Sequence, residues 1–260
     1  MDKRLQAFER LLIIMDDLRE KCPWDQKQTF ETLRTLTIEE TYELTDSISN
    51  NDLPSIEGEL GDLFLHLVFY CKLGNEIDAF SVESVLNKIC EKLIYRHPHI
   101  YGNVTVNSED EVKANWEKLK LKEGRISVLE GVPNSLPALI KATRIQEKVK
   151  GVGFDWENKS QVWGKVQEEL NELIEAESIG EIENIELEFG DVLFSLINYA
   201  RFIGVHPENA LEKTNKKFIS RFTKMEELLK NDSKDITCLP LLELDIYWEK
   251  AKKIIKQSNL

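Results

Sequence analysis

The sequence predicts an all-α protein built from two similar helical domains. Apolar residues recur every three or four positions along most of the 260-residue chain, which is the spacing of one face of a helix. The 7 prolines lie at the boundaries of these periodic segments, where they interrupt no predicted helix. No long run alternates polar and apolar residues as a strand would, although Val-Thr-Val at 104–106 is compatible with a short extended piece.

Five helices are expected in the first half. The first, at 3–21, carries Leu5, Leu12 and Met15 on one apolar stripe. Ser55 is a start signal for the third. The four helices that follow the first are expected at 32–49, 54–74, 81–96 and 109–121.

A connector separates this half from a second one of similar organisation. Residues 121–137 contain two glycines, two prolines and an Asn-Ser pair, a composition typical of loops. We therefore predict two domains, at 1–122 and 137–260. Helices in the second half are expected at 137–149, 160–178, 181–204, 207–230 and 240–256.

Four acidic residues occur in both halves at one fixed separation. In the first half they are Glu40, Glu43, Glu59 and Asp62. A shift of 129 residues, without a gap, leads to Glu169, Glu172, Glu188 and Asp191. One such cluster in an acidic chain would favour a solvated helix face. Recurrence of all four acids, each time before a similar apolar run (GDLFLHLVFY and GDVLFSLINY), favours a common function.

The spacing of these acids predicts a metal site. Residues three apart share a helix face, so two adjacent helices would direct four carboxylates into one space, where they repel one another. A divalent cation relieves that repulsion, and oxygen ligands favour Mg²⁺, with Mn²⁺ as a substitute, over Zn²⁺. The predicted catalytic and metal-binding residues are Glu169, Glu172, Glu188 and Asp191. A further metal site is predicted at Glu40, Glu43, Glu59 and Asp62.

Other side chains near the acids have two readings. Lys217 and Arg221 are four apart on one expected helix face and can bind phosphates, or they form an exposed helix surface. The chain has no GxxxxGK[ST] motif, which excludes a P-loop.

His66 has Ser195 as its counterpart in the second half, which favours a structural hydrogen bond over metal binding. Trp24 and Trp156 are interpreted as packing residues of turns.

Composition excludes several classes of partner. A net charge of −13 argues against binding to nucleic-acid polymers or anionic membranes, which require a basic face. The apolar run at 63–70 is far shorter than the roughly 20 residues that cross a bilayer, and the N-terminus lacks the pattern of a signal peptide. Four cysteines without CxxC spacing are expected to be reduced thiols of a cytoplasmic protein.

The first half contains the motifs CPWDQKQTF, LTIEETYEL, GELGDLF and RHPHIYG. The second half contains SLPALIKATRIQEK, VGFDW, the acid pairs and KKFISRF. Taken together, these motifs resemble the MazG family of nucleoside triphosphate pyrophosphohydrolases. The resemblance implies two tandem MazG-type helical bundles, a homodimer, and Mg²⁺-dependent hydrolysis of a nucleoside triphosphate to the monophosphate and pyrophosphate.

The resemblance also implies a set of substrate-binding residues. They are Lys165, Glu168, Lys217, Arg221, Trp248 and Lys252. Lys165 precedes Glu169 by one helical turn and can therefore reach the same pocket. Trp248 is expected either to stack on a base or to close a hydrophobic core.

The two halves are not equivalent in positive charge. Lys165 corresponds to Leu36 and Arg221 to Lys92, so the first half lacks one cation and one bidentate donor. We therefore expect the second half to carry most of the activity.

Two alternatives to this function remain: a dUTPase-like hydrolase of narrow base preference, and a non-enzymatic helical dimer that senses nucleotides. The preferred base, the sugar and the general base stay open.

Overall fold

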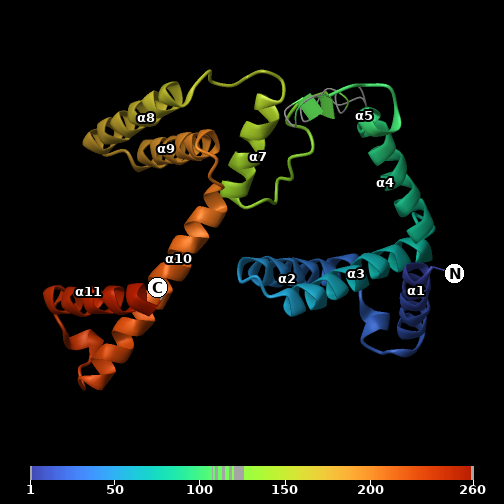
Figure 1. The fold of residues 1–260 in the computed structure, drawn as a ribbon, viewed down its shortest axis with the longest axis horizontal. Helices are drawn as coiled ribbons and strands as arrows, with labels where there is room; N and C mark the ends of the chain where they lie inside the picture. The colour runs from blue at the N-terminus through green and yellow to red at the C-terminus, as the bar shows by residue number, and fades with distance from the viewer. Residues whose placement is uncertain are drawn as a thin grey trace. The chain divides into compact units, whose positions relative to one another are not determined.

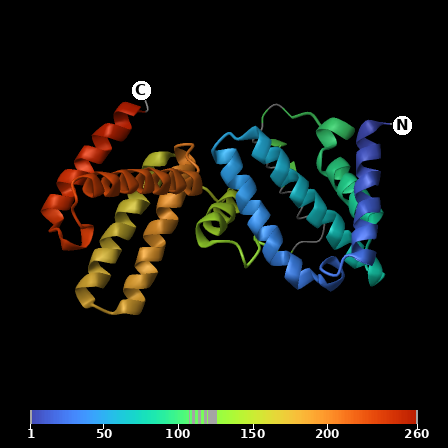
Figure 2. The ribbon, with the colours of Figure 1, turned by 90° about the horizontal axis from the view of Figure 1, so that it is seen from below.

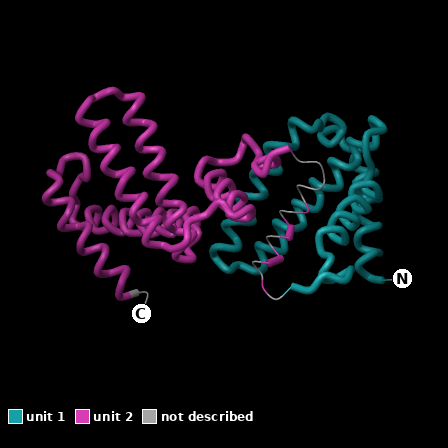
Figure 3. The backbone as a smooth tube through the Cα atoms, turned by 90° about the horizontal axis from the view of Figure 1, so that it is seen from above, with its two compact units in different colours: residues 1–106 teal, residues 107–260 magenta. Residues whose placement is uncertain are grey.

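The computed structural model describes residues 2–106, 108, 111, 112, 115, 116, 119 and 126–258. The chain divides into two compact units, Met1–Val106 and Asn107–Leu260 (Figure 3). The division lies ahead of the predicted connector at 121–137, and most residues between 107 and 125 lie outside the described part. The domain boundaries at 122 and 137 therefore stay a prediction, as does the helix at 109–121.

Unit 1 is a helical hairpin with further helices packed beside it (Figures 1 and 2). Helices α2 and α3 form the hairpin, and α1 packs against α3. Met15, Leu33 and Phe69 form its buried core. The helices of this unit, with one 3₁₀ turn, are α1 (Lys3–Lys21), η1 (Asp25–Lys27), α2 (Phe30–Ser49), α3 (Leu53–Glu76), α4 (Val82–Arg96) and α5 (Pro98–Tyr101).

Unit 2 contains a second hairpin of the same kind. Helices α8 and α9 lie side by side (Figures 1 and 2), and α7 packs on α9. Helix α11 folds back along α10, around a core that includes Leu229 and Ala251. The elements of this unit are α7 (Ala138–Lys150), α8 (Lys159–Ile179), α9 (Ile182–Phe202), α10 (Pro207–Asn231), η2 (Ile236–Cys238) and α11 (Leu241–Ser258).

The secondary structure confirms the predicted all-α class. Every described helix that we predicted is present, and the described residues contain no strand; 104–106 has no regular structure. The hairpin α8–α9 follows α2–α3 at the predicted separation of 129 residues. Helix α2 begins at Phe30 after the capping side chain of Thr29, and α8 begins at Lys159 after that of Asn158.

Two further expectations concern the surface and the thiols. No described helix is both long and apolar enough to cross a membrane. The four cysteines are free thiols, as predicted. The cytoplasmic location inferred from them stays a prediction.

Candidate metal and nucleotide site

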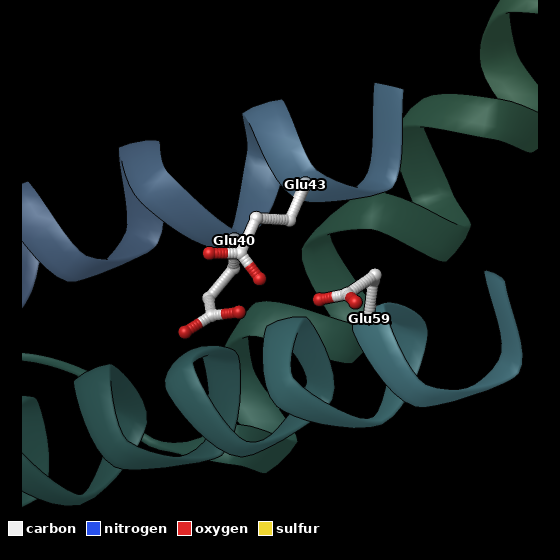
Figure 4. Close-up of side chains that lie close together, drawn as sticks. All are labelled: Glu40, Glu43 and Glu59. Atoms are coloured by element: carbon white, nitrogen blue, oxygen red, sulfur yellow. The ribbon is translucent and has the colours of Figure 1, made fainter. Parts of the chain in front are cut away.

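Each hairpin brings three of its four predicted acids together. The groups are Glu40, Glu43 and Glu59 in unit 1, and Glu169, Glu172 and Glu188 in unit 2; within each group, one oxygen of every carboxylate lies within 4.8 Å of the others. Figure 4 shows that the unit 1 side chains come from α2 and α3 and point into the space between the two helices. The i,i+3 spacing on one helix and the antiparallel pairing of the next produce this arrangement.

The fourth acid of each half lies beside its group rather than within it. Burial raises the pKa of Glu40, and the nearby charge of Asp62 raises it further. Asp191 lines the same cavity as Glu169. The structure thus places both aspartates near the sites where the sequence predicts metal ligands, and their role as ligands stays a prediction.

Carboxylate oxygens at these separations fit a hard divalent cation. Like charges at this range repel one another, and Mg²⁺ or Mn²⁺ prefers oxygen donors. The described residues place neither histidine nor cysteine in either acid group, so the donor set does not favour Zn²⁺.

Unit 1 leaves its acid group without a neighbouring lysine on α2. Leu36 stands where the second half has Lys165. Burial, and then the charges of Asp62 and Glu43, raise the pKa of Glu40 above its ordinary value. The protonated form of this carboxyl is therefore stabilised in the folded chain.

The raised pKa of Glu40 predicts a pH-dependent stability. A carboxyl with a higher pKa in the folded chain holds its proton more tightly there, so the free energy of unfolding falls as pH rises from the unfolded pKa through the folded one. In EDTA, Glu40→Gln is expected to melt above the wild type near pH 7, with the difference shrinking toward about pH 4. Thermal melts over this range check it, with the exposed Glu9→Gln as control. A difference that does not change with pH would contradict it.

Unit 2 supplies the cation that unit 1 lacks. The Lys165 Nζ lies 2.8 Å from Oε1 of Glu169 and donates to Oε1 of Glu168 at 2.7 Å. These two carboxylates raise the pKa of Lys165, so it stays charged. Glu169 is buried, whereas Glu172 is exposed and has a raised pKa because it shares a hydrogen bond with Glu169. The site thus combines clustered acids with one fixed positive charge.

A cavity of about 500 Å³ opens beside these residues in unit 2. Lys165, Glu169 and Asp191 contribute to its wall. The wall has other polar and aromatic residues that were not predicted from the sequence as site residues, which include Gln146, Phe154, Asp155, Trp156, Asn198 and Arg201. The VGFDW motif was the available signal. Trp156, interpreted from the sequence as a packing residue, is 44% exposed and lines the cavity.

The remaining predicted substrate-binding residues lie on α10 and α11. Trp248 packs against the α10–α11 core, with its ring centroid 5.1 Å from that of Phe218, which supports the packing interpretation of this residue. Lys252 pairs with Glu249 at 2.8 Å. None of the four residues Lys217, Arg221, Trp248 and Lys252 is among the residues that line the cavity. Their contact with substrate stays a prediction.

His66 has the structural role that the sequence favoured. It is buried in α3, and its Nδ1 lies 3.2 Å from Oγ1 of Thr37. Burial lowers its pKa, which favours the neutral ring. Thr37 also shares a 2.8 Å hydrogen bond with Tyr70, so His66 belongs to a polar network between α2 and α3.

Comparisons with known proteins agree with the repeat. The chain matches the MazG nucleotide pyrophosphohydrolase domain twice, at residues 28–101 and 158–225. It is 45% identical over 250 residues to the nucleoside triphosphate pyrophosphohydrolase/pyrophosphatase MazG of Thermotoga maritima, covering 94% of this chain and 95% of that protein. It is 38% identical over 258 residues to the nucleoside triphosphate pyrophosphohydrolase of Escherichia coli strain K12, covering 96% of this chain and 98% of that protein. Each matched domain contains one of the acid groups described above.

Proposed function

The chain belongs to the MazG family of nucleotide pyrophosphohydrolases, and we propose from this membership that it hydrolyses nucleoside triphosphates to the monophosphate and pyrophosphate. The observation that carries the proposal is the grouping of Glu169, Glu172 and Glu188 next to a cavity that also contains Lys165. This arrangement offers a place for a cation and a positive charge for phosphates. A purely nucleotide-sensing protein would not need the clustered acids.

We propose that the reaction depends on Mg²⁺, with Mn²⁺ as a substitute. The residues that would hold the ion are Glu169, Glu172, Glu188 and Asp191. When bound, the cation would polarise the phosphoryl group and lower the pKa of a water ligand. Lys165 lines the cavity, and its positive charge would attract the oxygens of the triphosphate. Water attacks the α-phosphorus, the bond from that phosphorus to the bridging oxygen breaks, and pyrophosphate leaves.

A product assay tests this function. The full-length protein is incubated with a panel of ribo- and deoxyribonucleoside triphosphates and Mg²⁺, and pyrophosphate and inorganic phosphate are measured separately. We expect stoichiometric pyrophosphate, no inorganic phosphate and loss of turnover in EDTA. In ¹⁸O-labelled water, the label is expected in the monophosphate. Label in pyrophosphate would exclude attack at the α-phosphorus, and hydrolysis of dUTP alone would favour the dUTPase-like alternative.

We further propose that the second half carries most of the activity. Positions 195 and 198, which line the cavity in unit 2 as Ser195 and Asn198, correspond to His66 and Phe69 in unit 1. Both unit 1 side chains are buried, and Phe69 belongs to the hydrophobic core. Larger residues therefore occupy, in the first half, the positions that line the cavity in the second.

We propose that the protein is a homodimer that pairs through α9. Ile182, Phe189, Leu193 and Leu196 follow one another at helical spacing, and all four are at least 40% exposed. An apolar stripe of this kind is the normal contact surface of a packed helix. A second copy of the chain would bury it.

Light scattering after gel filtration checks this assembly. The wild type is expected to have the mass of two chains, and Leu193→Glu is expected to shift it toward one, because a charge in an apolar contact is costly to bury. Leu211→Glu, the same change at an exposed leucine of α10, is the control and should leave the mass unchanged. A wild type with the mass of one chain contradicts the dimer.

A further inference from the structure

An exposed tryptophan of unit 1 lies on a turn whose backbone is held in place by side chains. Trp24, interpreted from the sequence as a packing residue, is 55% exposed. Arg19 of α1 donates hydrogen bonds to the backbone oxygens of Asp25 and Gln28. The Gln28 side chain donates to the backbone oxygen of Trp24 at 3.1 Å. Tryptophan is usually well buried, so a fixed turn that leaves this ring exposed indicates a contact surface.

The role of the equivalent ring in unit 2 does not explain Trp24. Trp156, on the corresponding turn before the second hairpin, lines the cavity of unit 2. In unit 1, His66 and Phe69 stand at two of the positions that line that cavity, and both are buried. Unit 1 therefore has an aromatic ring on the same turn but fills two of the cavity positions, which leaves Trp24 for a contact of another kind.

An open groove of about 520 Å³ adjoins this turn. Its lining residues are Asp16, Arg19, Glu20, Gln26, Lys72 and Glu76. Both cations of the groove are paired with carboxylates of the groove itself. Arg19 binds Glu76 at 2.9 Å, and Lys72 binds Asp16 at 2.6 Å. The donors that the groove contains are therefore largely engaged, and three carboxylates stand against two cations.

The polar groups that remain in the groove are acceptors. The Glu20 carboxylate has no hydrogen bond or ion pair within the described part of the chain. Gln26 uses its amide nitrogen to bind the backbone oxygen of Glu20, so its amide oxygen is left to accept. A cation rich in N–H donors complements such a surface. Arginine supplies five donors and a flat face that stacks on aromatic rings, whereas lysine supplies three donors on a compact ammonium group.

We propose that the turn at 22–28 and this groove form a docking surface for an arginine-containing segment of a partner protein. The guanidinium group binds the Glu20 carboxylate and the Gln26 amide oxygen, and the neighbouring part of the segment packs on the Trp24 ring. Tryptophan is prominent among the residues that dominate binding energy, and a fixed turn lowers the entropy lost on association. The net charge of −13 attracts a basic partner.

Fluorescence anisotropy with labelled peptides tests this surface on the full-length protein. The probes are a fluorescein-labelled peptide of arginine, glycine and leucine, and the same peptide with lysine in place of arginine. We expect the arginine peptide to bind about tenfold more tightly than the lysine peptide. Trp24→Ala and Glu20→Gln are each expected to weaken its binding by about tenfold. Trp24→Phe keeps an aromatic face and should weaken it less.

Matched variants separate this surface from general attraction to an acidic protein. Glu9→Gln makes the same change at an exposed site on α1, and Tyr101→Ala removes another exposed ring of unit 1; both should leave the affinity unchanged. Circular dichroism verifies that every variant is folded. Peptide binding needs neither nucleotide nor metal, so its result stands apart from the proposed hydrolysis.

Four outcomes would overturn the docking surface. They are no binding of the arginine peptide up to about 1 mM, equal affinity for the two peptides, displacement of the peptide by equimolar spermidine, and an affinity that neither Trp24→Ala nor Glu20→Gln changes.

Discussion

Replacing Glu169 and Glu172 together by glutamine is expected to lower kcat/KM for triphosphate hydrolysis by at least about a thousandfold. The two carboxylates supply two of the three oxygens that lie within 4.8 Å of one another in unit 2. Glutamine keeps their shape and removes their charge, so the cation they would hold loses most of its attraction. Steady-state pyrophosphate release at saturating Mg²⁺ measures the loss, and circular dichroism confirms that the helices persist.

The matched variant in the first half distinguishes the two sites. Glu40→Gln with Glu43→Gln makes the same change at positions related by 129 residues, in a group whose oxygens also lie within 4.8 Å of one another. We expect kcat/KM to stay within about threefold of the wild type, as for changes outside an active site. Activity lost in this variant and kept in the Glu169 and Glu172 variant would show that the first half is the catalytic one.

The fold could be predicted largely because local rules decide it. Helix α1 matches the expected 3–21, since an apolar stripe of period 3.6 specifies a helix and its buried face together. Helix α2 begins at Phe30, two residues before the expected start. Thr29 and Thr32 cap it reciprocally, with threonine in the position where the usual signal is Glu or Gln.

The ends of helices were harder to predict from the sequence where they depend on contacts with residues outside the helix. Helix α3 continues to Glu76, past the expected end at Gly74. Gly74 lies within the helix, and the ring of Phe80 packs so closely against it that an added Cβ would lie 2.5 Å from the ring. A glycine usually suggests the end of a helix, and here its role depends on a contact that the local sequence does not show.

The acids of the site could be predicted, and the cavity could not. A fixed repeat and the i,i+3 rule were enough to bring Glu169, Glu172 and Glu188 together. The polar groups that the cavity presents depend on how α7 packs on α9 and on which of their atoms are left without a hydrogen bond. The amide nitrogen of Gln146 donates to the backbone carbonyl of Phe194, which leaves the amide oxygen without a partner among the described residues. No pattern in the sequence indicates that pairing.

Replacing Lys165 by leucine, the residue at the equivalent position of the first half, is expected to lower kcat/KM by roughly tenfold to a hundredfold. Lys165 is bound to Glu168 and Glu169 at 2.7 and 2.8 Å, so its positive charge is held at the acid group and lines the cavity. Leucine removes both the attraction for phosphate and the charge that balances Glu169.

Two further variants show whether the charge of Lys165 matters at this position. Lys165→Arg keeps the charge and should recover most of the activity. Lys224→Leu removes a lysine with the same i,i+3 pairing, to Glu227 at 2.7 Å on α10, and should have little effect. If Lys165→Leu leaves KM and kcat unchanged, the ammonium group of Lys165 does not bind phosphate. The lower activity expected of the first half would then need a cause other than Leu36. His66 and Phe69, which stand where Ser195 and Asn198 line the cavity of the second half, would be such a cause.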